Sequence, residues 1–176
     1  PAAFVIPVLE WGHFPQAVRR KLVLEIAGGT GGPASAPRVV SVAESGYDCL
    51  VGEKIWLDGE LVDWDAARVH VLTHTLHYGL GVFEGIRCYA TDDGRSAIFR
   101  LPEHVRRLFD SARINLMEIP FSEEQITRGI VESLRANSLR EGYVRPIAFI
   151  GDGMMGLNPG DNPIRVAIIA YPWGAY

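Results

Sequence analysis

The stretch that most constrains what this chain can fold into is residues 82–89, VFEGIRCY. Side chains on a β-strand alternate between its two faces, so Phe83, Gly85, Arg87 and Tyr89 would share one face. That face combines a large apolar group, a bare backbone position and a cation. Glycine inside a strand marks either a bulge or a place where a ligand approaches the backbone. The pattern predicts a half-buried strand and leaves these two alternatives open. The opposite face carries the other four residues, Val82, Glu84, Ile86 and Cys88.

Turn and capping signals around this stretch predict further elements. Asp58-Gly59 lies between two apolar runs, and residues 91–94 (TDDG) follow the central stretch, so each predicts a β-hairpin. A first helix is expected to begin near Pro102, with Val105, Leu108, Phe109, Ala112 and Leu116 on one helical face. A second helix is expected at Ser122, where Gln125 completes a capping box.

Two apolar runs near the end of the chain predict two more strands. Residues 143–150 contain Pro146, which has no N–H to donate and therefore indicates an edge, a bulge or a strand start. Residues 164–171 are almost continuously apolar and indicate a central strand. Strands with helices segregated between them form an α+β domain.

Composition and length set the domain organisation. The chain has 176 residues, of which 48% are hydrophobic and 22% charged. Residues 28–37 (GGTGGPASAP) are typical of a linker, so we expect residues 1–50 to be a loosely ordered extension. A small α+β domain is expected over residues 51–170, and residues 171–176 would begin an interdomain linker.

Charge and cysteine usage exclude several classes of function. The net charge of −4 argues against a nucleic-acid surface, and no apolar run is long enough to span a membrane. The two cysteines have no metal-ligand spacing and form no disulfide framework, which favours a cytoplasmic location.

Several polar clusters leave alternatives open. His70, His74 and His77 lie near one helical face, but a metal site needs a further ligand, and packed or hydrogen-bonded histidines are the simpler interpretation. Arg107 is either a solvated helix charge or an anion ligand. Tyr143 and Arg145 face the same way on their strand, where they bind a carboxylate or line a polar surface.

Four blocks of sequence, in order, resemble the branched-chain amino-acid aminotransferases. They are HTLHYGLGVFEGIRCY, FRLPEHVRRLFDSA, GYVRPIAFIGDGMMGLNP and AYPWGAY. The resemblance implies the small N-terminal domain of the fold-type IV fold that binds pyridoxal 5′-phosphate, with the large domain absent from this chain. D-amino-acid aminotransferases and aminodeoxychorismate lyases share that fold and remain alternatives within the enzyme class.

The resemblance also implies a role for individual residues. Arg107 would bind the cofactor phosphate, while Phe83, Gly85 and Arg87 would line the substrate side of the cofactor. Tyr143 would lie near the substrate carboxylate.

Further residues implied by the resemblance belong to a pocket shared between subunits. Arg145, with Tyr176 and with Tyr78 of the partner subunit, would receive the distal carboxylate of glutamate. Met155 and Leu157 would close a neighbour's pocket, so a homodimer is the expected minimum unit.

The implied activity is transamination of L-leucine, L-isoleucine or L-valine with 2-oxoglutarate, in branched-chain amino-acid biosynthesis. The family's catalytic lysine lies downstream of AYPWGAY, whereas this chain has only Lys21 and Lys54. We therefore expect an N-terminal portion that lacks the catalytic lysine and is inactive alone. A complete, non-catalytic binding module with the same fold is the alternative from another class.

Overall fold

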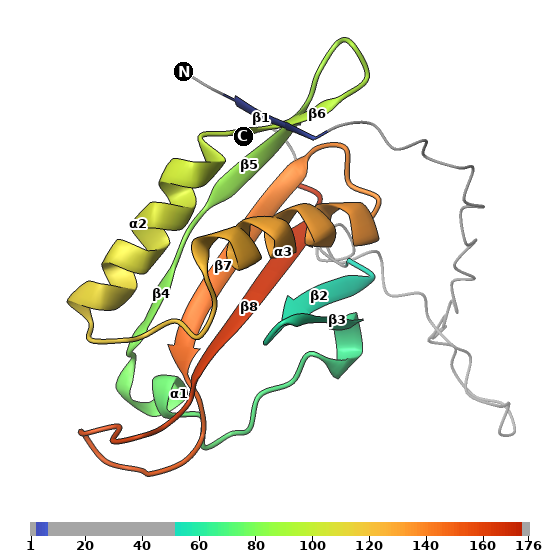
Figure 1. Ribbon diagram of the computed structural model, residues 1–176. Coiled ribbons are helices and arrows are strands. Elements are labelled where there is room, and N and C mark those ends of the chain that lie inside the picture. The colour runs from blue at the N-terminus through green and yellow to red at the C-terminus, as the bar shows by residue number, and fades with distance from the viewer. Residues whose placement is uncertain (1–2, 7–51, 174–176) are drawn as a thin grey trace, which may run out of the picture. The chain divides into compact units, whose positions relative to one another are not determined.

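One antiparallel sheet dominates the part of the chain that the computed structural model describes, residues 3–6 and 52–173. Its strands run in the order β1-β6-β5-β7-β8-β2-β3, and β4 also pairs with β7 (Figure 1). The strand bounds are β1 Ala3–Ile6, β2 Lys54–Leu57, β3 Glu60–Asp63, β4 Gly81–Phe83, β5 Ile86–Ala90, β6 Ser96–Phe99, β7 Gly142–Ile150 and β8 Ile164–Tyr171. As predicted, β8 lies inside the sheet, between β7 and β2.

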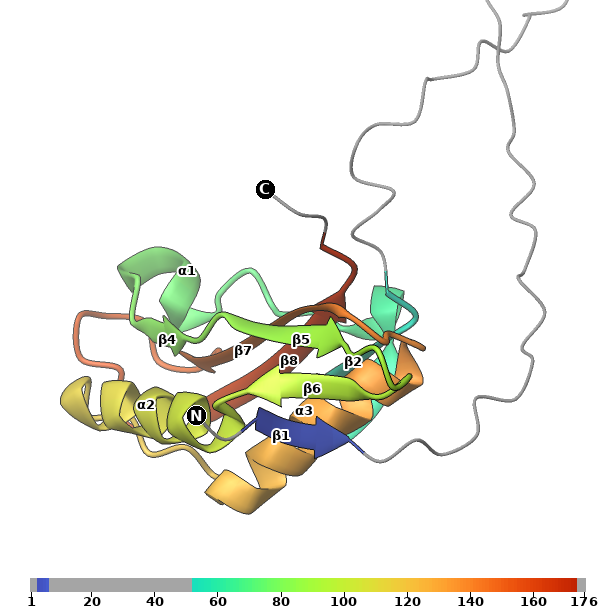
Figure 2. The same ribbon diagram turned by 90° about the horizontal axis from the view of Figure 1, so that it is seen from above.

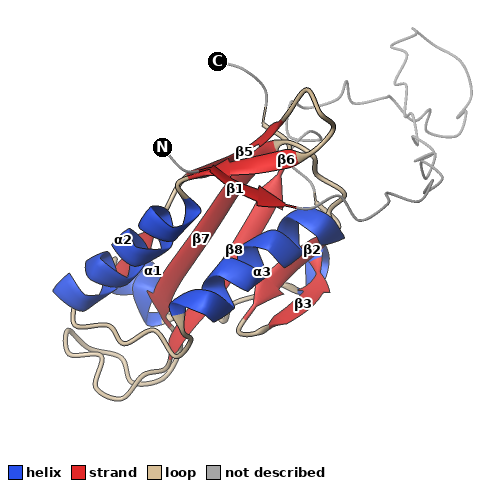
Figure 3. Cartoon of the chain, turned by 45° about the horizontal axis from the view of Figure 1, so that its top comes forward, coloured by secondary structure: helices blue, strands red, loops and turns tan. Residues whose placement is uncertain are grey.

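The two long helices, α2 (Leu101–Ile114) and α3 (Glu123–Ala136), cover one face of this sheet (Figures 2 and 3). Both were predicted from the sequence. Ser122 Oγ accepts a hydrogen bond from the Gln125 N–H, and the Gln125 side chain accepts one from the Ser122 N–H, so the expected capping box is present. A short helix, α1 (His74–Tyr78), lies on the other side of the sheet (Figure 2). A 3₁₀ turn, Trp64–Ala66, follows β3.

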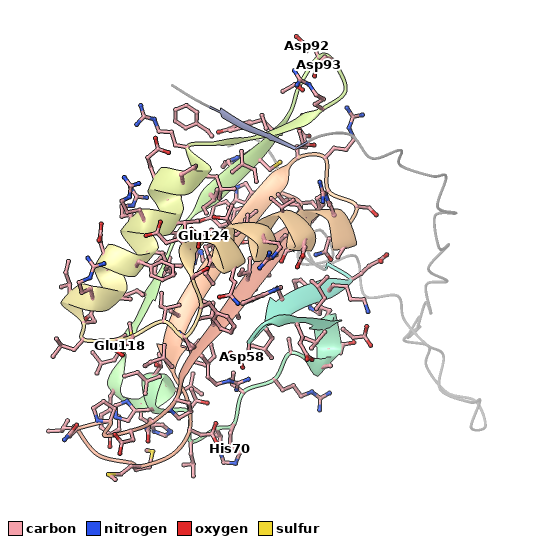
Figure 4. All side chains as sticks on the ribbon, in the orientation of Figure 1. Asp58, His70, Asp92, Asp93, Glu118 and Glu124 are labelled. Atoms are coloured by element: carbon pink, nitrogen blue, oxygen red, sulfur yellow. The ribbon has the colours of Figure 1, made fainter. Side chains whose placement is uncertain are left out.

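Both predicted hairpins are present. The β2–β3 turn places Asp58 at φ 49° and Gly59 at φ 103°, the left-handed conformations that this dipeptide favours. The Asp58 carboxylate also accepts hydrogen bonds from Val166 N at 2.9 Å and Arg165 Nε at 2.7 Å, which ties the turn to β8. Asp92 and Asp93 lie at the tip of the β5–β6 hairpin (Figure 4).

The expected strand over residues 82–89 is divided into β4 and β5, yet its pairing with β7 keeps one register. Phe83 lies opposite Ile147 and Ile86 lies opposite Val144, so no residue has been inserted between them. The bulge alternative is therefore excluded. The division coincides with Pro146: Glu84 N donates to the Pro146 carbonyl at 3.0 Å, but proline has no N–H to return the bond.

Two expectations were wrong. Pro146 does not mark an edge or a strand start, because β7 has neighbours on both sides. Leu116 was expected to share one face of the first helix with Val105 and Leu108, but α2 ends at Ile114, and Leu116 has φ 56° and is 93% exposed.

The core lies between the sheet and the two long helices. Its fully buried side chains include Leu108 of α2, Ile130 of α3, Val144 of β7 and Ile168 of β8. Of the expected extension, the structure describes only the backbone of β1, which pairs with β6. The proposed division at residues 50 and 170 stays a prediction.

Candidate functional site

The sheet face that α2 and α3 do not cover carries five of the ten predicted site residues. Along β7, Tyr143, Arg145 and Ile147 are half-buried, whereas Val144 and Ala148 are fully buried beneath the helices. The same alternation runs through β4 and β5, as predicted from residues 82–89. We call this half-exposed surface of β4, β5, β7 and β8 the open face.

Phe83, Gly85, Tyr143 and Arg145 form one cluster on the open face. Arg145 Nη2 donates to the Tyr143 hydroxyl at 2.8 Å. The Arg145 guanidinium carbon lies 4.4 Å from the Phe83 ring centroid, within the range of a cation–π contact. A Cβ added at Gly85 would overlap the Tyr143 hydroxyl, so the glycine makes room for this phenol. The sequence alone placed Tyr143 and Arg145 side by side, but it did not bring Gly85 beneath Tyr143.

Unsatisfied donors accompany this cluster. Arg87 lies opposite Tyr143 in the register, and its guanidinium carbon is 5.7 Å from the Tyr89 ring centroid. The Nε atoms of Arg87 and Arg145 are buried, and neither has a hydrogen-bond partner among the described residues. A buried donor without a partner is costly, so these two arginines suit a ligand that supplies anionic oxygens.

Arg107 lies on the opposite side of the sheet from this cluster. Its guanidinium group forms a bidentate pair with the Glu84 carboxylate, through Nε and Nη2, both at 2.6 Å. The Arg107 side chain is 65% exposed, whereas that of Glu84 is 5% exposed. His104 Nδ1 is 2.9 Å from Glu84 Oε2. Because an ionised carboxylate only accepts hydrogen bonds, His104 Nδ1 must carry a proton and donate it to Glu84. His104 Nδ1 also lies 3.4 Å from Arg107 Nη2, and since both nitrogens are donors they do not hydrogen-bond to each other.

The electrostatics of this cluster favour the ionised carboxylate. Burial by itself raises the pKa of Glu84. The hydrogen bonds from Arg107 and His104, together with the charge of Arg107, outweigh burial and hold the pKa of Glu84 below its usual range. In turn, the hydrogen bonds that Arg107 donates to Glu84 raise the pKa of Arg107.

Sequence reasoning missed Glu84 and His104, although a signal was available. Glu84 shares its strand face with Val82 and Ile86, so the alternation already predicted a carboxylate on an apolar face. A buried carboxylate needs a cationic partner. His104 and Arg107 are three residues apart on the predicted helix and so share one side of it.

The remaining predicted site residues lie at the α1 end of the sheet or outside the described residues. Tyr78 stacks on His74, with ring centroids 4.4 Å apart. Met155 and Leu157 lie in the loop between β7 and β8, where they are 41% and 87% exposed. Neither hydrogen bonds nor ring contacts join these three residues to Arg145 within the described part of the chain. Tyr176 lies outside the described residues.

The three histidines are hydrogen-bonded to backbone groups. His74 is fully buried, and its Nε2 is 2.7 Å from the Gly156 carbonyl oxygen, which holds the β7–β8 loop against α1. His77 Nε2 is 2.8 Å from the Val71 carbonyl oxygen. His70, on the loop before α1 (Figure 4), accepts a hydrogen bond from the Leu72 N–H at Nδ1. Residues 3–6 and 52–173 contain no cluster of three or more side chains suited to a metal ion.

Membrane insertion through a helix finds no support in the described part of the chain. None of the helices there has the length and apolarity that a membrane crossing requires.

Comparison with known sequences gives a family and close relatives. The family model for amino-transferase class IV matches residues 81–176. The branched-chain-amino-acid aminotransferase of Pseudomonas aeruginosa is 52% identical over 122 residues, which are 69% of this chain and 39% of that protein. That of Escherichia coli K12 is 46% identical over 123 residues, which are 69% of this chain and 40% of that protein. The chain thus spans about 40% of the length of these relatives.

Comparison with solved structures confirms the predicted fold class. The branched-chain amino acid aminotransferase of Escherichia coli matches with a TM-score of 0.69 and 44% identity, over 72% of this chain and 41% of that one. A second branched-chain amino acid aminotransferase, solved in complex with N-(5′-phosphopyridoxyl)-L-glutamate, matches with a TM-score of 0.68 and 45% identity, over 70% and 42%. The enzyme of Thermoproteus uzoniensis, solved with norvaline, matches with a TM-score of 0.66 and 41% identity, over 70% and 42%. The described chain is therefore an α+β portion of the fold-type IV architecture.

Proposed function

Because this chain belongs to the class IV aminotransferase family, as its sequence blocks predicted, we propose that the protein is a branched-chain amino-acid transaminase. It transfers the amino group of L-leucine, L-isoleucine or L-valine to 2-oxoglutarate, giving a branched 2-oxo acid and L-glutamate. Support for this choice within the family comes from the two named relatives at 52% and 46% identity.

The observation that carries the proposal is the cluster of Phe83, Tyr143 and Arg145 beside the bare Gly85 backbone. A transaminase of this kind must accept a branched apolar side chain and an acidic side chain in one pocket. The aromatic rings provide apolar contact for the first. The Arg145 guanidinium, held 2.8 Å from Tyr143 and over Phe83, provides a cation for the second. A buried carboxylate without such a partner would be too costly to bind.

The cofactor of this proposal is pyridoxal 5′-phosphate, and the residues present suit an anionic group of that kind. Arg107 would hold its phosphate, since Nη1 makes no hydrogen bond among the described residues and the side chain is 65% exposed. Arg87 and Arg145, with their unpartnered Nε atoms, suit carboxylate groups of the substrates. When bound, the cofactor supplies the electron sink that makes the substrate Cα–H bond labile.

The lysine that the family uses is not supplied by the described residues. Lys54 is the one lysine among them, and its Nζ lies 2.5 Å from Asp63 Oδ1 on the β2–β3 hairpin. The roles of the site residues in this chain are therefore binding and orientation: Arg145 and Tyr143 select the substrate side chain, and Phe83 excludes water from it.

A homodimer is the proposed working unit. Met155, Leu157 and Tyr78 are exposed by 41%, 87% and 38%, and within the described part of the chain no hydrogen bond or ring contact joins them to the cluster on the open face. Supplying these side chains to the pocket of a second copy would bury them. Size-exclusion chromatography with light scattering would measure the mass of the assembly.

Purified protein, as its gene encodes it, would test the activity directly. We expect L-glutamate to form from 2-oxoglutarate with each of the three branched L-amino acids, and far less activity with D-alanine. A preference for D-alanine, or pyruvate release from aminodeoxychorismate, would instead assign the protein to one of the related enzymes of the fold.

A substitution pair would test the dual-substrate pocket. Arg145→Ala should reduce kcat/KM for 2-oxoglutarate by about a hundredfold, since a charge-assisted hydrogen bond contributes up to about 3 kcal/mol, and should reduce that for L-leucine much less. Arg140→Ala, at an exposed arginine before β7, is the matched control and should change neither value. Equal losses for both substrates in Arg145→Ala would contradict the assignment of Arg145 to the distal carboxylate.

A further inference from the structure

Apart from histidine, Glu84 is the one charged residue among the buried side chains that the structure describes. It sits where Pro146 interrupts the pairing of β4 and β5 with β7, and its carboxylate points to the helix-covered face. There it accepts hydrogen bonds from Arg107 Nε and Nη2, both at 2.6 Å, and from His104 Nδ1 at 2.9 Å. The carboxylate is thus held by two side chains of α2.

This arrangement fixes the orientation of Arg107. An arginine side chain is long and flexible, and one that is 65% exposed would otherwise sample many rotamers. The bidentate pair confines the guanidinium plane to that of the Glu84 carboxylate, because two parallel N–H···O bonds are geometrically specific. Nε and Nη2 are occupied, and Nη1 is the nitrogen left for another acceptor.

Glu84 also connects the two faces of the sheet. Its chain neighbours, Phe83 and Gly85, point to the open face, where they form the cluster with Arg145 and Tyr143. Residues 83–85 therefore carry both the Glu84 carboxylate that holds Arg107 and two residues of the cluster on the open face.

We propose that Glu84 is a positioning residue, which with His104 orients Arg107 so that the Nη1 edge meets the phosphate of the cofactor. The inference rests on the proposed function, since it takes pyridoxal phosphate as the ligand of Arg107. Two effects of Glu84 oppose each other. Its negative charge weakens the attraction between Arg107 and a phosphate, whereas its hydrogen bonds pre-organise the guanidinium. Orientation prevails, because charge attraction at an exposed arginine is screened by water and salt.

Dissociation constants for pyridoxal 5′-phosphate and for pyridoxal, which lacks the phosphate, would test the proposal in the full-length protein. Glu84→Gln keeps the shape of the side chain but places an NH₂ group against an arginine donor. We expect it to weaken pyridoxal phosphate binding on the order of tenfold, the effect of losing one oriented charge-assisted hydrogen bond. Pyridoxal binding should stay at the wild-type value.

Two further variants separate orientation from charge. Glu84→Asp keeps the charge but draws the carboxylate back, so its affinity for pyridoxal phosphate should fall as in Glu84→Gln. Arg106→Gln removes the neighbouring exposed arginine of α2 and should leave both dissociation constants unchanged. Wild-type or tighter binding of pyridoxal phosphate by Glu84→Gln would overturn the proposal, as would an equal loss for both ligands.

The role of Arg107 itself needs a double variant. Arg107→Gln alone leaves a buried carboxylate without its cation and can fail to fold, whereas Glu84→Gln/Arg107→Gln removes both charges. We expect the double variant to lose its preference for pyridoxal phosphate over pyridoxal. If it kept the wild-type preference, the proposal would be overturned, while wild-type transamination assays would still decide the proposed function independently.

Discussion

The two faces of the sheet are built from the same strands but serve different purposes. On β7, Val144 and Ala148 are fully buried under α2 and α3, while their neighbours Tyr143 and Arg145 are half-buried on the open face. Among the described side chains, Glu84 is the one carboxylate buried on the covered face, and its charge is paired by Arg107. The open face instead gathers aromatic rings and two arginines whose buried Nε atoms have no hydrogen-bond partner among the described residues. One face therefore stabilises the fold, and the other is the face that we propose to bind the substrate.

The largest expected difference between the faces concerns stability. Ile168 and Ile169 are neighbours on β8, but Ile168 is fully buried on the covered face and Ile169 is half-buried on the open face. Ile168→Ala should lower the free energy of unfolding by about 2–5 kcal/mol, because it removes buried methyl groups and leaves a cavity. Ile169→Ala should lower the free energy of unfolding by about half of that amount or less, because its side chain is only half-buried. Urea denaturation measures both, and equal losses would show that the two faces are equally packed.

A smaller effect should separate ligand binding from stability on the open face. In Gly85→Ala the added methyl group would overlap the Tyr143 hydroxyl and move it away from Arg145. We expect the KM for 2-oxoglutarate to rise about tenfold, equivalent to about 1.4 kcal/mol, with little change in the urea midpoint. Gly81→Ala, whose added methyl group would first meet Thr75 at 3.2 Å, is the control in β4. If Gly81→Ala raised the KM as much, the Tyr143 overlap would not be the cause.

The smallest expected effect is the pH dependence contributed by Glu84. Its folded-state pKa lies below the unfolded value, so its contribution to stability is complete above the unfolded pKa and is lost as the pH falls through the folded pKa. The wild type should therefore lose more unfolding free energy between about pH 5 and about pH 3 than Glu84→Gln does. Glu60→Gln, at an exposed position of β3, should follow the wild type. Identical profiles for wild type and Glu84→Gln would show that the carboxylate contributes nothing through its ion pair.

Local signals in the sequence predicted much of the fold correctly. The Asp58-Gly59 turn and the Ser122–Gln125 capping box depend on residues within four positions of each other, so their physics is contained in short peptides. The alternation over residues 82–89 likewise predicted which side chains share a face, because strand geometry sets a period of two. Leu116 shows the limit of such reasoning, since the helical spacing of apolar residues in the sequence continues beyond Ile114, where α2 ends.

Contacts between distant segments could not be predicted in this way. Pro146 is accommodated inside the sheet because its missing N–H falls opposite Glu84, 62 positions earlier, where the β4–β5 pairing is interrupted. Glu84 and Arg107 are 23 residues apart, and their pairing depends on how α2 crosses the strand. The roles of Arg107, Tyr78, Met155, Leu157 and Tyr176 in a cofactor or substrate site stay predictions.

The sequence by itself determined the family, the two hairpins, the two long helices and the last two strands, and the two-faced character of residues 82–89. Local patterns and matching blocks carry that information, whereas β1, α1 and the division between β4 and β5 were not predicted. Only the tertiary structure decided that Phe83, Gly85, Tyr143 and Arg145 meet on one face while Glu84 and Arg107 pair on the other. The physical reason is that strand register and helix packing, which link residues far apart in the chain, select the partners of each polar group. The stretch around Glu84 thus joins both faces, but the groups that it meets on each face come from distant parts of the chain.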